Sequence, residues 1–299
     1  MDTAAEEWVR AQVTPVGAIE TVHERPWATV SRVPVAGGIA WFKECAPVQG
    51  FEPRLTVALS SRWPDRVTEV LASDASAGWL LLGDAGTQVR TLGNPPSVWL
   101  SALPLYAELQ RGEAEHVDEH LARGVPDLRV SKLPLRYDDL VSRDLPLSGD
   151  EIESLRRFAP RFGEMCAELD ADGVPPSVQH DDLHMNNLYV GEGSWRVIDW
   201  GDTSISQPFM SLVITFRFLE EFNHLRPDDP WFARLRDAYL EPWGPGLQNT
   251  FDLAMRVGGF ARAFALIRVR DVLPPDFLTA FDHDLATVLR RALTAADSP

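Results

Sequence analysis

The segment "VQHDDLHMNN", residues 178–187, brings two histidines, two adjacent aspartates and two adjacent asparagines together. Strand-like "LYV", the turn-forming "GEGS" and strand-like "WRVID" follow it, a pattern typical of a β-hairpin. Because hairpin arms are antiparallel, Asn187 before the first arm and Asp199 at the end of the second should lie close together. Their oxygens are ligands that a hard cation such as Mg²⁺ prefers. The nearby Asp182 carboxylate can orient and deprotonate an attacking hydroxyl.

A second candidate group involves the rare lysines of the chain. Only two of the 28 basic residues are lysines, Lys43 and Lys132. Since the chain otherwise uses arginine as its cation, a retained lysine indicates a need for a compact point charge. Lys43 lies in the strand-like "GIAWFKECA", and Glu52 opens the helical "FEPRLTVALSSRW". An ion pair between Lys43 and Glu52 would hold the ammonium where nucleotide phosphates can lie, as phosphoryl transfer requires.

The elements that must position these residues change in type near residue 93. Before it, "WATVSRVPV" and "GIAWFKECA" flank the turn "AGG", and "GWLLLGD" is a short apolar run, so strands dominate around one helix. After it the pattern is helical, and a capping box from Ser148 to Glu151 opens one long helix. Further helices are predicted near 208–225, 231–240, 251–270 and 276–294.

Composition excludes several classes of function. The net charge of −16 argues against a nucleic-acid partner, because phosphate binding needs clustered basic side chains. Most of the excess acidity follows residue 93, which would attract a cationic substrate or simply keep the surface solvated. Cys45 and Cys166 form no CxxC pair, and no apolar run is long enough to cross a bilayer. We therefore expect a cytoplasmic protein with no membrane partner.

The paired segments "HDDLHMNN" and "VIDWGD" resemble the H-G-D-L-H-x-x-N and I-D-W motifs of the aminoglycoside phosphotransferase (APH) family. The surrounding "GIAWFKECAP", "FEPRLTVAL" and "GWLLLGDAG" are also similar to that family, so the resemblance extends from about residue 27 to residue 218. It implies an α+β, bilobal, protein-kinase-like fold. The implied parts are an N-terminal nucleotide-binding lobe at 1–86, an inter-lobe linker at 87–96, and a C-terminal catalytic and substrate-binding lobe at 97–299.

The resemblance also assigns roles to individual residues. Asp182 is implied to be the catalytic aspartate, Asn187 and Asp199 the metal ligands, Lys43 the phosphate-binding lysine and Glu52 its helix partner. The implied activity is transfer of the γ-phosphoryl group of ATP or GTP, with Mg²⁺, to a hydroxyl of a small polar molecule. Aminoglycosides and other amine or sugar compounds are the candidate acceptors, and a cationic acceptor suits the acidic charge balance.

The sequence departs from the family pattern in two places. Asp181 replaces the usual glycine; its side chain either binds the substrate or points outward, and we expect the outward orientation. No G-x-G-x-x-G precedes Lys43, so the phosphate-covering loop is expected to be a hairpin of other sequence around residues 31–38. His180 is expected to be a buried residue that braces the loop, whereas His184 is either a supporting hydrogen-bonding residue or simply exposed.

The residues alone leave two other functions possible. A metallohydrolase could use His180, Asp182, His184 and Asp199 as an H-x-D-x-H type of metal cluster. A non-catalytic nucleotide-binding module with a degenerate site is the third hypothesis, although no core catalytic position is missing.

Overall fold

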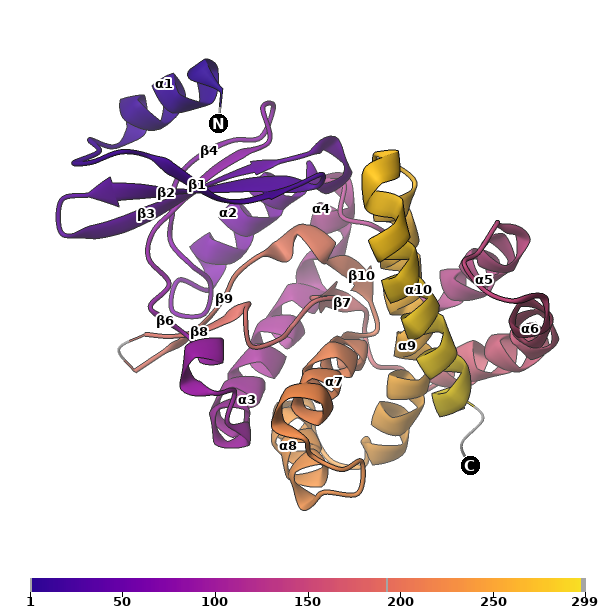
Figure 1. Ribbon diagram of the computed structural model, residues 1–299. Helices are drawn as coiled ribbons and strands as arrows, with labels where there is room; N and C mark the ends of the chain where they lie inside the picture. Colours follow the sequence, from indigo (N-terminus) through magenta and orange to yellow (C-terminus); the bar gives the residue numbers. More distant parts are fainter. Residues whose placement is uncertain (1, 192, 297–299) are drawn as a thin grey trace. The chain divides into compact units, whose positions relative to one another are not determined.

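The computed structural model describes residues 2–191 and 193–296, and the chain forms two compact units (Figure 1). The first unit comprises Met1–Pro95, Ala122–Val125 and His184–Asp202, and the second comprises Pro96–Leu121, Pro126–Leu183 and Thr203–Pro299. A large antiparallel sheet lies in the first unit and most helices lie in the second, which confirms the predicted α+β class. The boundaries at 1–86, 87–96 and 97–299 stay a prediction.

The first unit is built on a five-stranded antiparallel sheet with the spatial order β1-β2-β3-β5-β4, and β6, β8 and β9 form a separate three-stranded sheet. Its longer elements are α1 (Thr3–Gln12), β1 (Glu20–Arg25), β2 (Ala28–Val35), β3 (Gly38–Cys45), α2 (Glu52–Arg62), β4 (Val70–Asp74), β5 (Trp79–Leu82), β6 (Thr87–Gln88), β8 (Leu188–Val190) and β9 (Trp195–Val197). Short 3₁₀ helices occupy Pro47–Gln49, Val89–Leu92 and Trp200–Asp202.

Alternation along β3 gives the five-stranded sheet two different faces. Phe42 packs with Ala5 and Val9 of α1 in one apolar cluster, and Figure 1 shows α1 lying along the sheet. Because successive side chains of a strand point to opposite faces, Lys43 projects away from this cluster. There its ammonium meets Glu52, the first residue of α2. The alternation of β3 therefore separates the apolar core from the charged face of the sheet.

The second unit is mainly helical, with one short two-stranded sheet, β7–β10. Its longer elements are α3 (Pro96–Glu113), α4 (Val117–Ala122), α5 (Leu133–Ser142), α6 (Gly149–Ala171), β7 (Ser177–Gln179), β10 (Ser204–Ser206), α7 (Leu212–Asn223), α8 (Pro230–Leu240), α9 (Gln248–Arg270) and α10 (Pro275–Ala296). Short 3₁₀ helices occupy Ala114–His116, Val130–Lys132, Pro208–Ser211 and Glu241–Trp243.

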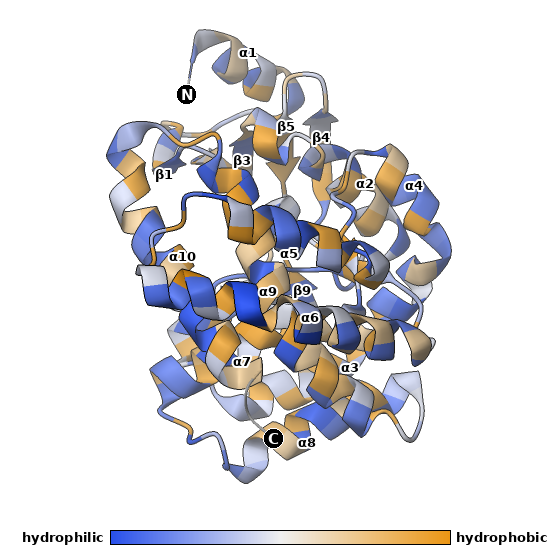
Figure 2. Ribbon diagram, turned by 90° about the vertical axis from the view of Figure 1, so that its right-hand side faces the viewer, coloured by the Kyte–Doolittle hydropathy of each residue, from blue (hydrophilic) through white to orange (hydrophobic). Residues whose placement is uncertain are grey.

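Aromatic packing forms one core of the second unit. Tyr137 of α5 stacks on Phe162 of α6, with ring centroids 4.5 Å apart, and Phe260 of α9 meets Phe162 edge-on at 5.1 Å. In Figure 2, α5, α6 and α10 carry alternating hydrophobic and hydrophilic bands, as amphipathic helices with one solvated side should. The capping box predicted from Ser148 to Glu151 is present at the start of α6.

Among the residues that the structure describes, no helix is both long enough and apolar enough to cross a membrane.

Candidate active site

A buried lysine stands between two carboxylates in the first unit. The Lys43 Nζ atom lies 2.8 Å from Glu52 Oε1 and 2.5 Å from Asp199 Oδ1. Lys43 and Glu52 retain only 6% and 2% of their exposure, whereas 47% of the Asp199 side chain is exposed. The predicted ion pair between Lys43 and Glu52 is therefore present, and Asp199 joins it from a segment far along the chain.

Electrostatics keep the Lys43 ammonium charged. Burial alone would lower the pKa of Lys43, but the carboxylates of Asp199 and Glu52 outweigh burial and hold the pKa well above its ordinary value. Burial raises the pKa of the Glu52 carboxyl, and the Lys43 ammonium opposes that shift. Burial also raises the pKa of Cys45, which therefore stays a thiol and donates from Sγ to Glu52 Oε2 over 3.3 Å.

The hairpin that carries Asn187 and Asp199 forms as predicted. Strands β8 and β9 are antiparallel, with Leu188 opposite Val197, and the Ile198 N–H donates to the Asn187 carbonyl oxygen over 3.0 Å. Asn187 and Asp199 thus flank the open end of the hairpin. Asp199 adopts a left-handed backbone conformation with φ of 63°, which aspartate tolerates better than most residues.

The donor set at this hairpin fits a hard divalent cation. Asp199 offers a carboxylate and Asn187 an amide oxygen, and Asp199 already binds a cation, the Lys43 ammonium. Mg²⁺ is commonly held by one or two carboxylates, with water and substrate phosphates completing its shell, rather than by a cage made wholly of protein. Asn187 and Asp199 could therefore hold such an ion, and their role as metal ligands stays a prediction.

The second unit carries Asp182, held by side chains of its own unit. The Arg262 Nη2 atom of α9 donates to Asp182 Oδ1 over 3.0 Å, and the two side chains are 13% and 26% exposed. The Asp182 N–H donates to Nδ1 of the fully buried His180 over 3.2 Å. The His180 N–H in turn donates to Tyr106 Oη over 3.1 Å. This chain of contacts confirms the bracing position predicted for His180.

The outward orientation expected for Asp181 is wrong. Asp181 is 2% exposed, and its carboxylate accepts hydrogen bonds from Gln179 Nε2 at 2.7 Å and Ser204 Oγ at 2.8 Å. Gln179 of β7 and Ser204 of β10 are paired across the short two-stranded sheet, so the Asp181 carboxylate links these two strands. The reason is local: a buried carboxylate needs such donors, and the short sheet supplies them.

His184 is buried, so the alternative that its side chain is simply exposed is wrong. It retains 8% of its exposure, and its Nδ1 accepts the Asn186 N–H over 3.1 Å. In both His180 and His184, Nδ1 accepts a backbone N–H inside the loop. That use of the rings stabilises the loop backbone and gives no support to a metallohydrolase cluster.

The phosphate-covering hairpin expected around residues 31–38 lies at the wrong end of the sheet. Lys43 pairs with Val30 of β2, whereas the β2–β3 turn follows Val35. Five residues of strand place that turn about 17 Å from the Lys43 row. The β1–β2 turn follows Arg25, close to Val30 in the register, so it is the hairpin at the Lys43 end.

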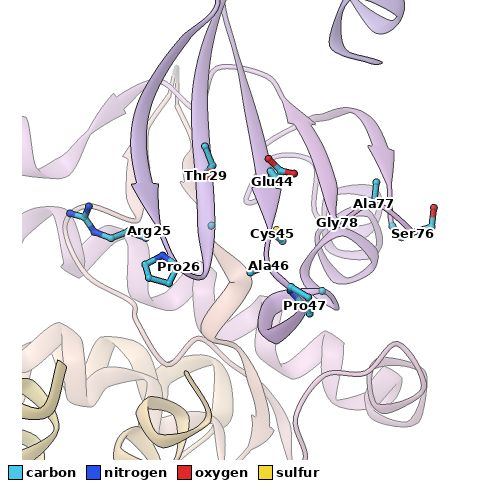
Figure 3. Close-up of a pocket in the computed structure, with 13 residues that line it drawn as sticks. Arg25, Pro26, Thr29, Glu44, Cys45, Ala46, Pro47, Ser76, Ala77 and Gly78 are labelled. Atoms are coloured by element: carbon cyan, nitrogen blue, oxygen red, sulfur yellow. The ribbon is translucent and has the colours of Figure 1, made fainter. Parts of the chain in front are cut away.

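A cavity of about 460 Å³ also lies in the first unit, beside the end of β3 (Figure 3). Thr29 and Glu44 project from neighbouring strands, and Pro47 and Gly78 lie below and beside them. Its lining includes Cys45 but not Lys43, and neither carboxylate partner of Lys43 belongs to it. The cavity therefore adjoins the charged cluster through Cys45, whose thiol donates to Glu52.

The structure distributes the predicted residues over both units. Lys43, Glu52, Asn187 and Asp199 lie in the first unit, and Asp182 lies in the second. Sequence reasoning missed Arg262. Its signal was available: Arg262 is the single charged residue in the otherwise apolar stretch "VGGFARAFALI", residues 257–267.

The sheet with its buried Lys43–Glu52 pair, the Asn187–Asp199 hairpin and the helical unit with Asp182 define the class of kinase-like phosphotransferases. The family model described as "Phosphotransferase enzyme family" (APH) matches residues 17–250. The chain belongs to this family, and it is by class a small-molecule kinase. No curated protein matches the sequence significantly.

Solved structures share the fold along nearly the whole chain. A choline/ethanolamine kinase family protein from Mesorhizobium loti is 13% identical, with a TM-score of 0.64 over 98% of this chain and 99% of its own. The GDP and kanamycin complex of APH(2")-IIia is 15% identical, with a TM-score of 0.65 over 99% and 98%. The amicoumacin kinase hAmiN, in complex with AMP-PNP, Ca²⁺ and Ami, is 11% identical, with a TM-score of 0.62 over 100% and 95%. At these identities the likeness establishes the protein-kinase-like fold.

Proposed function

We propose that the protein transfers the γ-phosphoryl group of ATP or GTP to a hydroxyl of a small polar acceptor, with Mg²⁺ as the metal. The observation that carries this proposal is the buried Lys43 ammonium between Glu52 and Asp199. A buried cation held by two carboxylates suits a polyanionic ligand, because phosphate oxygens can replace one of its partners. The more exposed partner, Asp199, is the one that can turn to a metal ion.

Each residue then has a distinct task. Glu52 fixes the Lys43 ammonium, which binds phosphate oxygens of the nucleotide. Asn187 and Asp199 would hold the metal ion, which when bound neutralises phosphate charge and orients the triphosphate. Asp182 accepts the proton of the acceptor hydroxyl while the new bond from oxygen to the γ-phosphorus forms and the bond to the leaving nucleoside diphosphate breaks.

The acceptor class rests on chemistry of the chain and on its neighbours. Kanamycin and Ami occupy two neighbours, and a third belongs to a choline/ethanolamine kinase family. The net charge of −16 suits a cationic amine or amino sugar and disfavours nucleic acid. We propose aminoglycosides and other amine or sugar alcohols as the candidates. We also propose the division at 1–86, 87–96 and 97–299 and a cytoplasmic location, where nucleoside triphosphates are abundant.

The test is Asp182→Asn, which keeps the shape of the side chain but removes its charge and basicity. Wild type is first screened by thermal shift with Mg·ATP or Mg·GTP and a panel of aminoglycosides, choline-like amines and sugars, and the hits are assayed for transfer. We expect the variant to bind Mg·nucleotide within about 2-fold of wild type while transfer falls by about 100-fold or more. Near wild-type transfer by a variant that binds nucleotide normally would refute the role of Asp182.

A further inference from the structure

Arg262 is a mostly buried charge in an apolar helix segment. Residues 257–267 of α9 are otherwise apolar or glycine, and the Arg262 side chain is 13% exposed. A guanidinium in such surroundings costs free energy unless a carboxylate compensates it. Its partner is the Asp182 carboxylate, 3.0 Å away, on a loop 80 residues earlier in the chain. The contact therefore supplies a carboxylate that compensates the Arg262 charge at this position of α9.

Close packing between α9 and α7 fixes the position of Arg262. Gly258 lies one turn before Arg262, and a Cβ at Gly258 would meet Val213 Cγ2 of α7 at 2.8 Å. Only a glycine lets α9 approach α7 so closely. On α7, Thr215 Oγ1 donates to the Leu183 carbonyl oxygen over 2.7 Å. Helix α7 therefore contacts both partners of the ion pair indirectly: it binds the backbone of Leu183, the residue after Asp182, and it packs against α9, which carries Arg262.

We propose that Arg262 is a positioning residue for phosphoryl transfer: it holds the Asp182 carboxylate in the orientation that receives the acceptor proton. The proposal rests on the function proposed for Asp182. Protein kinases often carry an arginine directly before the catalytic aspartate, whereas His180 and Asp181 precede Asp182 here. The cation comes instead from α9, and its planar fork restricts the carboxylate in a way that a flexible ammonium does not.

The structure offers a matched control on the same helix. Arg270 pairs with Asp282 at 2.5 Å, and both side chains are 25% exposed. This pair joins α9 to α10 and contacts neither Asp182 nor its loop. An arginine that only stabilises the helical unit should therefore behave as Arg270 does when it is replaced.

The experiment compares Arg262→Met, Arg262→Lys and Arg270→Met with wild type. Nucleotide affinity is measured by thermal shift, and kcat and KM are measured with the best acceptor, or with water as the acceptor in ATP hydrolysis. We expect Arg262→Met to lower kcat by about 10- to 100-fold, with nucleotide affinity within about 2-fold. Arg262→Lys should keep more activity than Arg262→Met, and Arg270→Met should leave kcat within about 2-fold of wild type.

A double variant separates positioning from structural support. If Arg262 acts through Asp182, adding Arg262→Met to Asp182→Asn should lower the residual rate no further. A wild-type kcat in Arg262→Met, or a full additional loss in the double variant, would overturn the positioning role. If Arg262→Met does not fold, Arg262→Lys decides, because an unchanged kcat in that folded variant would equally overturn it. Full transfer activity of Asp182→Asn would instead refute the catalytic role of Asp182, whereas a wild-type protein that transfers no phosphoryl group from Mg·ATP or Mg·GTP to any acceptor or to water would refute the proposed function itself.

Discussion

Replacing Lys43 by methionine should destabilise the protein chiefly through the partner that it leaves behind. Glu52 is 2% exposed, so without the ammonium its carboxylate keeps only the Cys45 thiol among the partners described above. Removing one member of a buried pair typically costs about 3–5 kcal/mol. Asp199, with 47% of its side chain exposed, can be solvated by water and should add little. We therefore expect Lys43→Met to lower the free energy of unfolding by about 3–5 kcal/mol at neutral pH.

The loss should depend on pH with a definite sign. Burial already raises the pKa of Glu52, and removing Lys43 takes away the charge that opposes this shift. A carboxyl whose pKa is higher in the folded state binds a proton more readily there than in the unfolded chain, so protonation favours folding. Relative to wild type, the deficit of Lys43→Met should be smallest below the folded pKa that Glu52 has in wild type, grow as pH rises through that pKa, and level off above the higher folded pKa that Glu52 has in the variant.

Urea unfolding followed by the fluorescence of the ten tryptophans measures this from about pH 4.5 to about pH 8. Lys132→Met is the control, because the Lys132 side chain is 50% exposed and lies 3.2 Å from Asp127. Such an exposed pair contributes at most about 1 kcal/mol. The double variant Lys43→Met/Glu52→Gln should recover part of the stability at neutral pH. A Lys43→Met protein as stable as Lys132→Met, with no dependence on pH, would refute this reasoning.

Asp199→Asn isolates the loss of charge, because asparagine also tolerates the left-handed backbone at this position. In this variant Mg²⁺ should no longer tighten nucleotide binding. Titration calorimetry with and without Mg²⁺ measures this effect. An unchanged Mg²⁺ effect would contradict the metal assignment. Gly258→Ala should lower stability by about 1–3 kcal/mol, because its Cβ would overlap Val213. Gly163→Ala on α6, where nothing lies within 4 Å of the new Cβ, should instead gain about 0.5–1 kcal/mol. Equal unfolding midpoints for the two glycine variants would contradict this packing argument.

Local signals in the sequence were sufficient for much of the fold. Strand alternation and turn residues predicted the β2–β3 and β8–β9 hairpins, and the capping box predicted the start of α6. The helix predicted near 208–225 starts later, because Pro208–Ser211 forms a 3₁₀ helix before α7 begins at Leu212. The sequence interpretation missed α1 and β1. Every position of β1 is exposed, so it carries no apolar alternation, and α1 is short.

The site was predictable where chemistry and spacing coincide. The Lys43–Glu52 ion pair followed from a rare lysine in a strand before a helix, and the Asn187–Asp199 proximity followed from hairpin geometry. The orientation of Asp181 was not predictable, because its donors belong to β7 and to β10 on the far side of the hairpin. Arg262 is visible in the sequence as a lone charge in an apolar stretch, but its contact with Asp182 was not predictable, because the two residues are distant in sequence.

The scarcity of lysine also determines how the protein responds to amine chemistry. Of the two lysine side chains, that of Lys132 is 50% exposed, whereas that of Lys43 is 8% exposed and held by two carboxylates. An acylating reagent used to couple the protein to a sensor surface should therefore react at Lys132, on the 3₁₀ helix Val130–Lys132, and spare Lys43. All molecules that are coupled through Lys132 then have the same orientation on the surface, and their Lys43 ammonium stays chemically intact.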